Sequence, residues 1–341
     1  MMKFLAVLAL AVVGLMPVAA EARIITDAAG RTVSVPDKIN RILVAGPPAT
    51  ALVYVLAPEK LVGWVHAPDD AAKAYLMPSV RSLPTVGRLT GKDGAISSQA
   101  VIDAKPDIIL DAGTVDPTYK ALADKVQSDT HIPYVLIDGS FARTADTLRD
   151  VGALIGVEDR ANKLADYADT AIKDLNEKLA TLPNDPRPRV YYGRGADGLE
   201  TGLSGSINLE ILDAVGTMNV AAAAGKGGLA KVTVQQVVGW NPDIIIAESP
   251  AFAASVKSDP QWAGIKAVKD GKIFVPLSLP FGWFDSPPGV NRLLGVRWME
   301  KLLYPKLFRS DFSEDVKEFY KLFYQVDLTD DQLAALLKGM K

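Results

Sequence analysis

The chain has 341 residues, of which 49% are hydrophobic and 23% are charged. Its 37 basic and 40 acidic side chains leave a net charge of −3, which excludes a nucleic-acid-binding protein held by a basic face. The length predicts about two domains, each with a buried core, rather than a disordered or fibrous chain. With no cysteine and two histidines, the chain has no disulfide, no thiolate metal site, no lipid-modified cysteine and no histidine-built metal cage.

Residues 1–22 have the pattern of a signal peptide. Lys3 precedes an apolar run from Phe4 to Met16, and Ala20-Glu21-Ala22 fits a small-residue cleavage site. The run is too short to span the ~30 Å hydrocarbon core of a membrane as a helix. We therefore expect a cleaved signal peptide and a mature protein that is free in the periplasm and is not a lipoprotein.

The first half of the mature chain alternates between strand and helix patterns. In order, the sequence predicts hairpin strands at 23–26 and 32–35, a strand at 41–45, a helix at 50–57, a short strand at 61–64, a helix from Ser98 to Ala104, and strands at 106–111 and 134–138. Buried strands that alternate with helices predict a parallel sheet covered on both faces.

The second half repeats this plan. Pro106 and Pro242 each end a helix and open the strand motif Pro-Asp-Ile-Ile, and the early strand at Arg41 has a counterpart at Arg189. The remaining expected elements are a helix from about Ile207, a helix capped by Thr233, a strand at 272–276, and helices at 313–323 and 329–338. The repeat predicts two lobes of like topology.

A long amphipathic helix is expected between the two repeats, at about 158–182, with apolar residues spaced by three and four positions. It is either a connection that crosses from one lobe to the other or an ordinary packed helix within one lobe. We adopt the crossing, because of its place between the repeats. The predicted organisation is an N-terminal lobe at 23–142, a linking helical segment at 143–183, and a C-terminal lobe at 184–341 that ends in packing helices.

Four stretches carry a resemblance to a known family: 30–36 followed by 41–44, Ala104–Leu110, Asn241–Ile246, and Trp262 with 267–274. Over nearly all of the mature chain they resemble the helical-backbone class of periplasmic solute-binding proteins, which serve ABC importers of iron–siderophore complexes, haem, cobalamin and some oxyanions. The resemblance implies an α/β fold with two Rossmann-like parallel-sheet lobes joined by one long backbone helix. It also implies a ligand held between lobes that move little.

The segment from Gly193 to Gly198 matches G-x-G-x-x-G after a strand, which is the pattern of a dinucleotide-binding turn. That turn requires a helix to begin within the motif, whereas here the loop continues to about Ile207. We therefore predict a long loop that faces the cleft. Arg194 in this loop is either an anion contact, since its planar fork binds oxyanions, or one half of a surface salt bridge.

The most distinctive local sequence contains Phe281, Trp283 and Phe284 beside two prolines. Aromatic side chains in a cleft stack on planar ligand groups, so we expect at least one of the three to contact the ligand. The alternative is a small core beneath the following helix. Asp285 or Ser286 could equally serve only to cap that helix.

Other candidate ligand contacts lie near predicted strand ends. Trp64 and Arg88 belong to the first lobe. Tyr192 belongs to the second, and its hydroxyl group suits oxyanions or ferric chelates. His66 and His131 are interpreted as loop or packing residues, and no metal ligands are predicted.

In the family that the chain resembles, a glutamate on the first helix of each lobe docks on arginines of the permease. Glu210 fits that position in the second lobe, and the resemblance implies a docking role for it. The matching position in the first lobe is Ala51. A symmetrical docking pair is therefore not expected.

The resemblance implies a periplasmic binding protein that captures a chelated metal, with an iron(III)–siderophore as the first expectation, and delivers it to an inner-membrane ABC permease with its ATPase. An oxyanion such as molybdate or tungstate, haem, and cobalamin are alternative ligands. Chelatase-type enzymes also use two facing lobes, but the chain has no H-x-x-E or G-x-S-x-G motif. We therefore expect a monomeric binding protein, with no enzymatic activity, no cofactor and no nucleic-acid partner.

Overall fold

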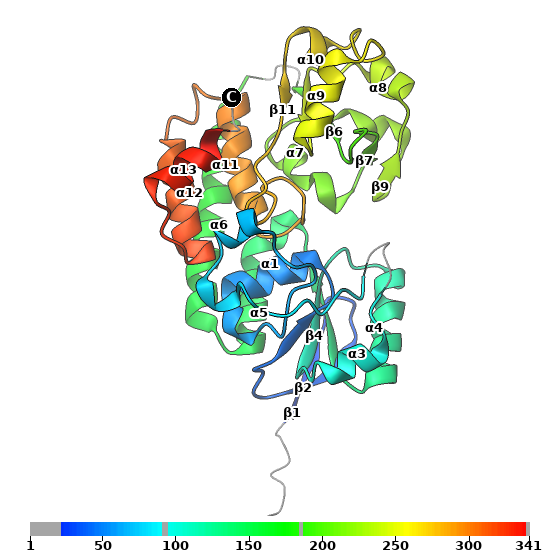
Figure 1. Cartoon of the computed structure of the whole chain (residues 1–341), viewed down its shortest axis with the longest axis vertical. Coiled ribbons are helices and arrows are strands. Elements are labelled where there is room, and N and C mark those ends of the chain that lie inside the picture. Colours follow the sequence, from blue (N-terminus) through cyan, green and yellow to red (C-terminus); the bar gives the residue numbers. More distant parts are fainter. Residues whose placement is uncertain (1–21, 91–94, 184–186, 339–341) are drawn as a thin grey trace, which may run out of the picture.

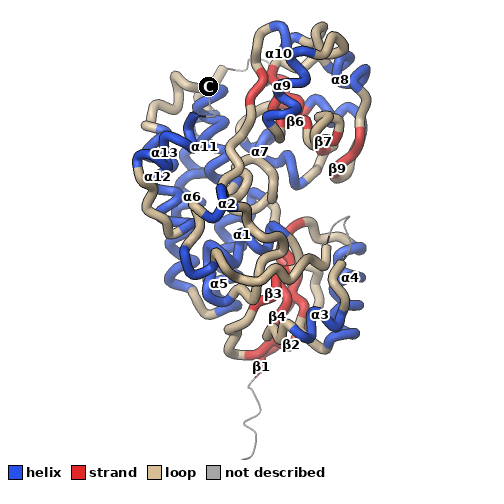
Figure 2. The backbone as a smooth tube through the Cα atoms, in the orientation of Figure 1, coloured by secondary structure: helices blue, strands red, loops and turns tan. Residues whose placement is uncertain are grey.

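The computed structural model describes residues 22–90, 95–183 and 187–338. Apart from Ala22, the predicted signal peptide lies outside the described residues. Two α/β lobes lie one above the other and are joined along one side by helices (Figure 1). Each lobe has a parallel sheet, which confirms the predicted fold class. Figure 2 shows the strands confined to the lobes and helices forming most of the joint.

The N-terminal lobe opens with an antiparallel hairpin and continues into a parallel sheet of order β3-β4-β5. Side chains from alternate strand positions enter two separate apolar clusters, so both faces of this sheet are covered, as predicted. Its strands and helices are β1 (Ala22–Thr26), β2 (Thr32–Pro36), β3 (Ile42–Val44), α1 (Pro47–Leu56), α2 (Asp70–Lys73), α3 (Ser98–Asp103), β4 (Ile108–Gly113), α4 (Pro117–Thr130), β5 (Tyr134–Asp138) and α5 (Thr144–Ile155).

Three local predictions in this lobe need correction. Residues 61–64 form two isolated bridges, Ile42 to Leu61 and Trp64 to Thr85, rather than a strand. Helix α1 begins at Pro47, earlier than expected, because the fixed φ of proline suits a first helical turn. Ser97, not Ser98, caps α3 and accepts a hydrogen bond from the Ala100 N–H at 3.2 Å.

The C-terminal lobe has a parallel sheet of order β11-β10-β6-β8 and a small antiparallel pair, β7 and β9. The pair follows β6 directly, where a dinucleotide fold would start a helix. The elements of this lobe are β6 (Arg189–Gly193), β7 (Glu200–Gly202), α7 (Glu210–Ala214), β8 (Met218–Asn219), β9 (Leu229–Lys231), α8 (Val234–Trp240), β10 (Ile244–Ala247), α9 (Pro250–Ser258), α10 (Lys266–Lys269) and β11 (Ile273–Phe274).

The sequence repeat corresponds to a repeated hydrogen bond, here called a clip, in which an aspartate accepts from a backbone N–H at the start of the neighbouring strand. In the first lobe, Asp107 Oδ2 accepts a hydrogen bond from the Arg41 N–H at 2.9 Å. In the second lobe, Asp243 Oδ2 accepts one from the Arg189 N–H at 3.0 Å. Just after the preceding helices, α3 and α8, Lys105 and Asn241 take left-handed φ angles of 47° and 46°.

Helix α6 (Glu158–Leu179) connects the two lobes. At 1.5 Å per residue its 22 residues extend about 33 Å. Near its start, Arg160 Nε donates to the carbonyl of Val55 in α1 at 2.9 Å. At its end, Leu179 lies 3.7 Å from the position that a Cβ on Gly216 would take, in the C-terminal lobe. The crossing helix is therefore α6, whereas α5 packs on the N-terminal lobe.

The terminal helices lie beside α6 and reach back to the N-terminal lobe (Figure 1). The Tyr54 hydroxyl donates to the Tyr324 carbonyl at 2.8 Å, and Gln332 Nε2 donates to the Ala74 carbonyl at 3.0 Å. One apolar cluster runs through both lobes and these helices. The terminal elements are α11 (Arg292–Leu303), α12 (Phe312–Phe319), a π-helical turn (Tyr320–Tyr324) and α13 (Asp330–Leu337).

Candidate ligand-binding site between the lobes

The segment 281–291 lies between the strand ends of the two lobes. On one side, the Ser286 hydroxyl donates to Glu248 Oε1 at 2.7 Å, immediately after β10. On the other side, a Cβ on Gly289 would lie 3.6 Å from the Cβ of Ala51 in α1. Ligands of open parallel sheets lie beyond the carboxyl ends of the strands. The facing strand ends and this segment therefore define the candidate site.

Arg194 follows β6 and is the centre of a charged cluster on the C-terminal lobe. Its Nη1 lies 3.0 Å from Asp285 Oδ2, and its Nε lies 3.6 Å from Glu248 Oε1 and 3.8 Å from Glu200 Oε2. Asn208 Nδ2 donates to the other oxygen of Asp285. The Arg194 side chain is 17% exposed, so the ion pairs it forms are mostly buried rather than on the surface. The predicted anion contact of Arg194 stays a prediction.

Burial controls the ionisation of this cluster. The Asp285 carboxyl is buried, and desolvation raises its pKa to about 6 although Arg194 acts to lower it. Burial also raises the pKa of the Tyr192 phenol well above its usual value, and the nearby charge of Asp285 adds to this. Tyr192 therefore remains neutral at physiological pH.

Two hydrogen bonds and one ion pair surround the Glu248 carboxylate. The Gly195 N–H donates to Oε2 at 2.7 Å, the Ser286 hydroxyl donates to Oε1 at 2.7 Å, and the Arg194 Nε lies 3.6 Å from Oε1. A backbone amide, a hydroxyl and a guanidinium are groups that bind oxyanions. This edge of the C-terminal lobe can therefore hold an oxygen-bearing anion in the manner in which it holds Glu248.

The N-terminal lobe contributes hydroxyl groups at its own strand ends. Thr90 Oγ1 donates to the Ala45 carbonyl after β3 at 3.2 Å, and Ser140 follows β5. A cavity of about 20 Å³ separates this edge from the segment 281–291. It is lined by Pro48, Leu52, Ala112, Gly139, Ser140, Thr144, Thr147, Pro288, Gly289, Val290 and Arg292.

The aromatic side chains predicted to contact the ligand are mostly buried. Trp283 is 0% exposed and packs edge-on against Phe312 and Tyr320. Phe284 is 1% exposed, and its ring centroid lies 4.4 Å from that of Tyr192. The burial arises because α12 and the π-helical turn cover the loop. The alternative of a core beneath the loop therefore fits Trp283 and Phe284 better than ligand stacking.

Phe281 and the first-lobe candidates occupy three different environments. Phe281 is half-buried and packs edge-on against Tyr54 and Tyr324. Trp64 is 2% exposed, and its Nε1 donates to the Val80 carbonyl at 2.8 Å, so its role is in the core. Arg88 is half-buried in the loop before Leu89, whose N–H donates to the Ala45 carbonyl after β3 at 2.8 Å.

The structure adds two site residues that the sequence reasoning missed. Glu248 directly follows a predicted strand, and this position could have identified it. Arg292 has no local sequence signal, since it begins α11 and its partner Gly139 lies 153 positions away in the sequence. Among the described residues, no group of three histidine, aspartate or glutamate side chains is arranged to hold a metal ion.

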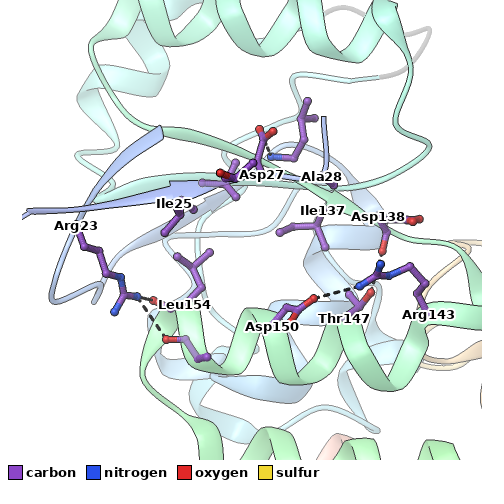
Figure 3. Close-up of a pocket in the computed structure, with 14 residues that line it drawn as sticks. Arg23, Ile25, Asp27, Ala28, Ile137, Asp138, Arg143, Thr147, Asp150 and Leu154 are labelled. Atoms are coloured by element: carbon purple, nitrogen blue, oxygen red, sulfur yellow. Dashed lines mark hydrogen bonds and ion pairs between the residues drawn. The ribbon is translucent and has the colours of Figure 1, made fainter. Parts of the chain in front are cut away.

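A second cavity, of about 630 Å³, lies within the N-terminal lobe between β1, β5 and α5 (Figure 3). Its charged side chains already have partners. Arg23 donates to the carbonyl of Leu154, and Arg143 Nη2 lies 3.3 Å from Asp150 Oδ2. All of its lining residues belong to 23–154, so the second lobe does not contribute to it.

Comparison with known proteins defines the class. The family model described as "Periplasmic binding protein" matches residues 46–276, and the chain belongs to this family. Its fold is that of the helical-backbone solute-binding proteins of ABC importers, as the resemblance implied. Within the described residues, no helix is both long enough and apolar enough to cross a membrane.

Several particular proteins are similar over much of the chain. The molybdate-binding protein MolA of Haemophilus influenzae is 28% identical over 92% of this chain and 93% of its own length. Its molybdate-bound structure matches with a TM-score of 0.73, at 26% identity, over 90% of this chain and 99% of that one. An ABC transporter solute-binding protein of Sulfurospirillum deleyianum matches with a TM-score of 0.82, at 29% identity, over 93% and 99%.

A further relative, the Fe(3+)-citrate-binding protein YfmC of Bacillus subtilis, is 25% identical over 52% of this chain and 55% of its own length. These relatives are solute-binding proteins, in keeping with the expectation of a binding protein rather than an enzyme. The chain is thus a periplasmic solute-binding protein of an ABC transporter, with a small-molecule ligand and a permease partner.

Proposed function

We propose that the protein captures a small oxyanion of the molybdate type between its lobes and delivers it to the permease of an ABC importer. The observation that carries this choice is the burial of Trp64, Trp283 and Phe284. A large chelate such as a siderophore, haem or cobalamin needs an open apolar surface to contact, and these side chains do not supply it.

The relatives support the same choice. The similarity to MolA, a molybdate-binding protein, extends over 92% of this chain, whereas the similarity to a Fe(3+)-citrate-binding protein covers 52%.

The proposed contacts lie on both strand edges. On the C-terminal lobe, the oxyanion would accept hydrogen bonds from the Gly195 N–H, the Ser286 hydroxyl and Arg194, in place of the Glu248 carboxylate. On the N-terminal lobe, the Ser140 hydroxyl lines the facing cavity. We further infer a free, monomeric mature protein that begins near Arg23 and carries no lipid anchor, since the chain has no cysteine.

Calorimetric titration of the mature protein with molybdate, tungstate, sulfate and ferric citrate tests this proposal. Saturable binding of molybdate and tungstate is expected. Binding of ferric citrate without binding of any oxyanion would replace the proposal with the iron-chelate alternative.

Ser286→Ala sharpens the test, because it removes one donor to the ligand. The loss of a hydrogen bond to a charged group should weaken molybdate binding about tenfold, or roughly 1.4 kcal/mol. Ser258→Ala is the matched control, since Ser258 ends α9 and its hydroxyl bonds only to its own helix. Equal affinities in the two variants would remove Ser286 from the site.

A further inference from the structure

Glu210 bridges the two lobes at the base of the candidate site. It begins α7 in the C-terminal lobe, and its Oε2 accepts a hydrogen bond from the Phe141 N–H at 2.6 Å. Phe141 follows β5 in the N-terminal lobe. The same oxygen lies 3.0 Å from Arg292 Nη1. One carboxylate oxygen thus links the N-terminal lobe, the C-terminal lobe and the start of α11.

Arg292 completes the link from the other side. It is 1% exposed, and its Nη2 donates to the carbonyl of Gly139 at 2.6 Å, at the end of β5. Its Nη1 also donates to the Ile207 carbonyl of the C-terminal lobe at 2.9 Å. The guanidinium carbon lies 5.5 Å from the centroid of the Phe141 ring. The side chain therefore holds one strand end of the first lobe against the α7 region of the second.

The two charges depend on each other. Burial lowers the pKa of Arg292, and the nearby carboxylate of Glu210 raises it. A guanidinium that is removed from water and loses its carboxylate becomes an unpaired buried charge, which is strongly unfavourable. An arginine of a permease that recruited Glu210 would leave Arg292 in that condition.

The corresponding position in the first lobe is fully buried, whereas the Glu210 side chain is 31% exposed. Ala51 is 0% exposed and lies under Gly289. Both positions at which the family resemblance implied docking residues therefore lie at the contact between the lobes. This placement does not favour the permease-docking role predicted for Glu210.

We propose that Glu210 and Arg292 form a clasp that fixes the distance between the facing strand edges, with Glu210 as a positioning residue rather than a docking residue. The clasp forms part of the wall of the small cavity between the lobes, since Gly139 and Arg292 both line it. Its loss should let the lobes sample more separations. The fraction of molecules in the binding-competent arrangement then falls, and the apparent affinity falls with it.

The experiment measures the separation of the lobes directly. The chain has no cysteine, so Thr118→Cys in α4 and Gln235→Cys in α8 allow specific spin labels at one exposed position in each lobe. Glu210→Gln should broaden the distribution of label distances about twofold. Glu177→Gln, an exposed glutamate on α6, is the matched control and should not.

Arg292→Lys is a second variant, which keeps the charge but loses the planar fork. It should broaden the distribution as Glu210→Gln does. An unchanged distribution in both variants would overturn the clasp. This measurement needs no ligand, so its outcome is independent of the proposed cargo.

A second measurement, which rests on the proposed function, uses molybdate as the probe. Glu210→Gln should raise its dissociation constant about tenfold if the competent fraction falls to roughly a tenth. A broadened distance distribution with no molybdate binding by the unmodified protein would keep the clasp and reject the cargo. Unchanged affinity together with an unchanged distribution, but failure to stimulate the permease, would restore the docking role.

Discussion

Each lobe has a buried aspartate whose carboxyl pKa is raised, and the two environments differ. Asp111 in β4 of the N-terminal lobe accepts a hydrogen bond from the Tyr134 hydroxyl at 2.9 Å. Asp285 of the C-terminal lobe lies 3.0 Å from Arg194. Burial raises the pKa of both carboxyls to about 6. Burial therefore raises the carboxyl pKa both for Asp111, whose hydrogen-bond partner is a phenol, and for Asp285, which lies in a charged cluster at the candidate site.

The two environments distinguish Asp111, which lies outside the candidate site, from Asp285, which belongs to it. The charge of Asp111 has a phenol as its hydrogen-bond partner, and its ionisation costs stability. The charge of Asp285 belongs to a network in which Arg194 also faces Glu248 and Glu200. Topology is repeated between the lobes, whereas the chemistry of the strand ends is not.

The largest expected effect comes from breaking the network on the C-terminal lobe. Arg194→Met should destabilise the protein by about 3–5 kcal/mol, because it leaves the buried carboxylate of Asp285 without its cation. Arg149→Gln on the surface should change stability by less than about 0.5 kcal/mol. Urea unfolding at pH 8 measures both, and similar free energies of unfolding in the two variants would show that the network contributes little.

Asp111→Asn should act in the opposite direction. In the folded protein the carboxyl pKa is about 6, against an ordinary value of 3.8, so the contribution of Asp111 to stability is present below pH 4 and is lost as the pH rises through 6. The variant should match the unmodified protein near pH 4 and exceed its stability at pH 8 by roughly 3 kcal/mol. Asp169→Asn on the exposed face of α6 is the control.

Urea unfolding at pH 4 and pH 8 measures this prediction. Asp169→Asn should show no increase in the free energy of unfolding at pH 8. A loss of stability at pH 8 in Asp111→Asn would show that the ionised carboxylate is stabilising, and would remove the contrast with Asp285.

The smallest expected effect is a change in molybdate affinity, which should differ between the variants of Asp285 and Asp111. Asp285→Asn removes a negative charge beside Arg194, so molybdate should bind about tenfold more tightly, a gain of roughly 1.4 kcal/mol. Asp111→Asn should leave the affinity unchanged, since the Asp111 carboxyl is buried and hydrogen-bonded to Tyr134 within the N-terminal lobe. Calorimetry on both variants tests this. Equal gains in both would mean that net charge rather than the local network controls binding.

Much of the fold follows from local sequence patterns. The prolines at 106 and 242, with the aspartates that follow them, predicted two equivalent helix-to-strand connections, and the structure contains both clips. The amphipathic spacing predicted α6. These features were accessible because a proline, a capping aspartate and helical periodicity act within a few residues.

The site was less accessible, because distant residues decide it. Trp283 has the same local sequence whether it faces a cleft or a core, and Phe312 and Tyr320, far along the chain, bury it. Arg292 contacts Gly139, which is 153 positions away. No local pattern encodes such contacts. Glu248 differs from these, since its position at a strand end could have identified it, although the sequence reasoning missed it.

The central claim is that an oxyanion binds between the lobes at the charged edge of the C-terminal lobe. Anomalous diffraction at the molybdenum edge, from crystals grown with molybdate, tests it most directly. The account predicts one strong peak between the lobes, within hydrogen-bonding distance of the Ser286 hydroxyl and the Arg194 guanidinium. A peak in the cavity beside Arg23 and Arg143, with none between the lobes, would contradict it.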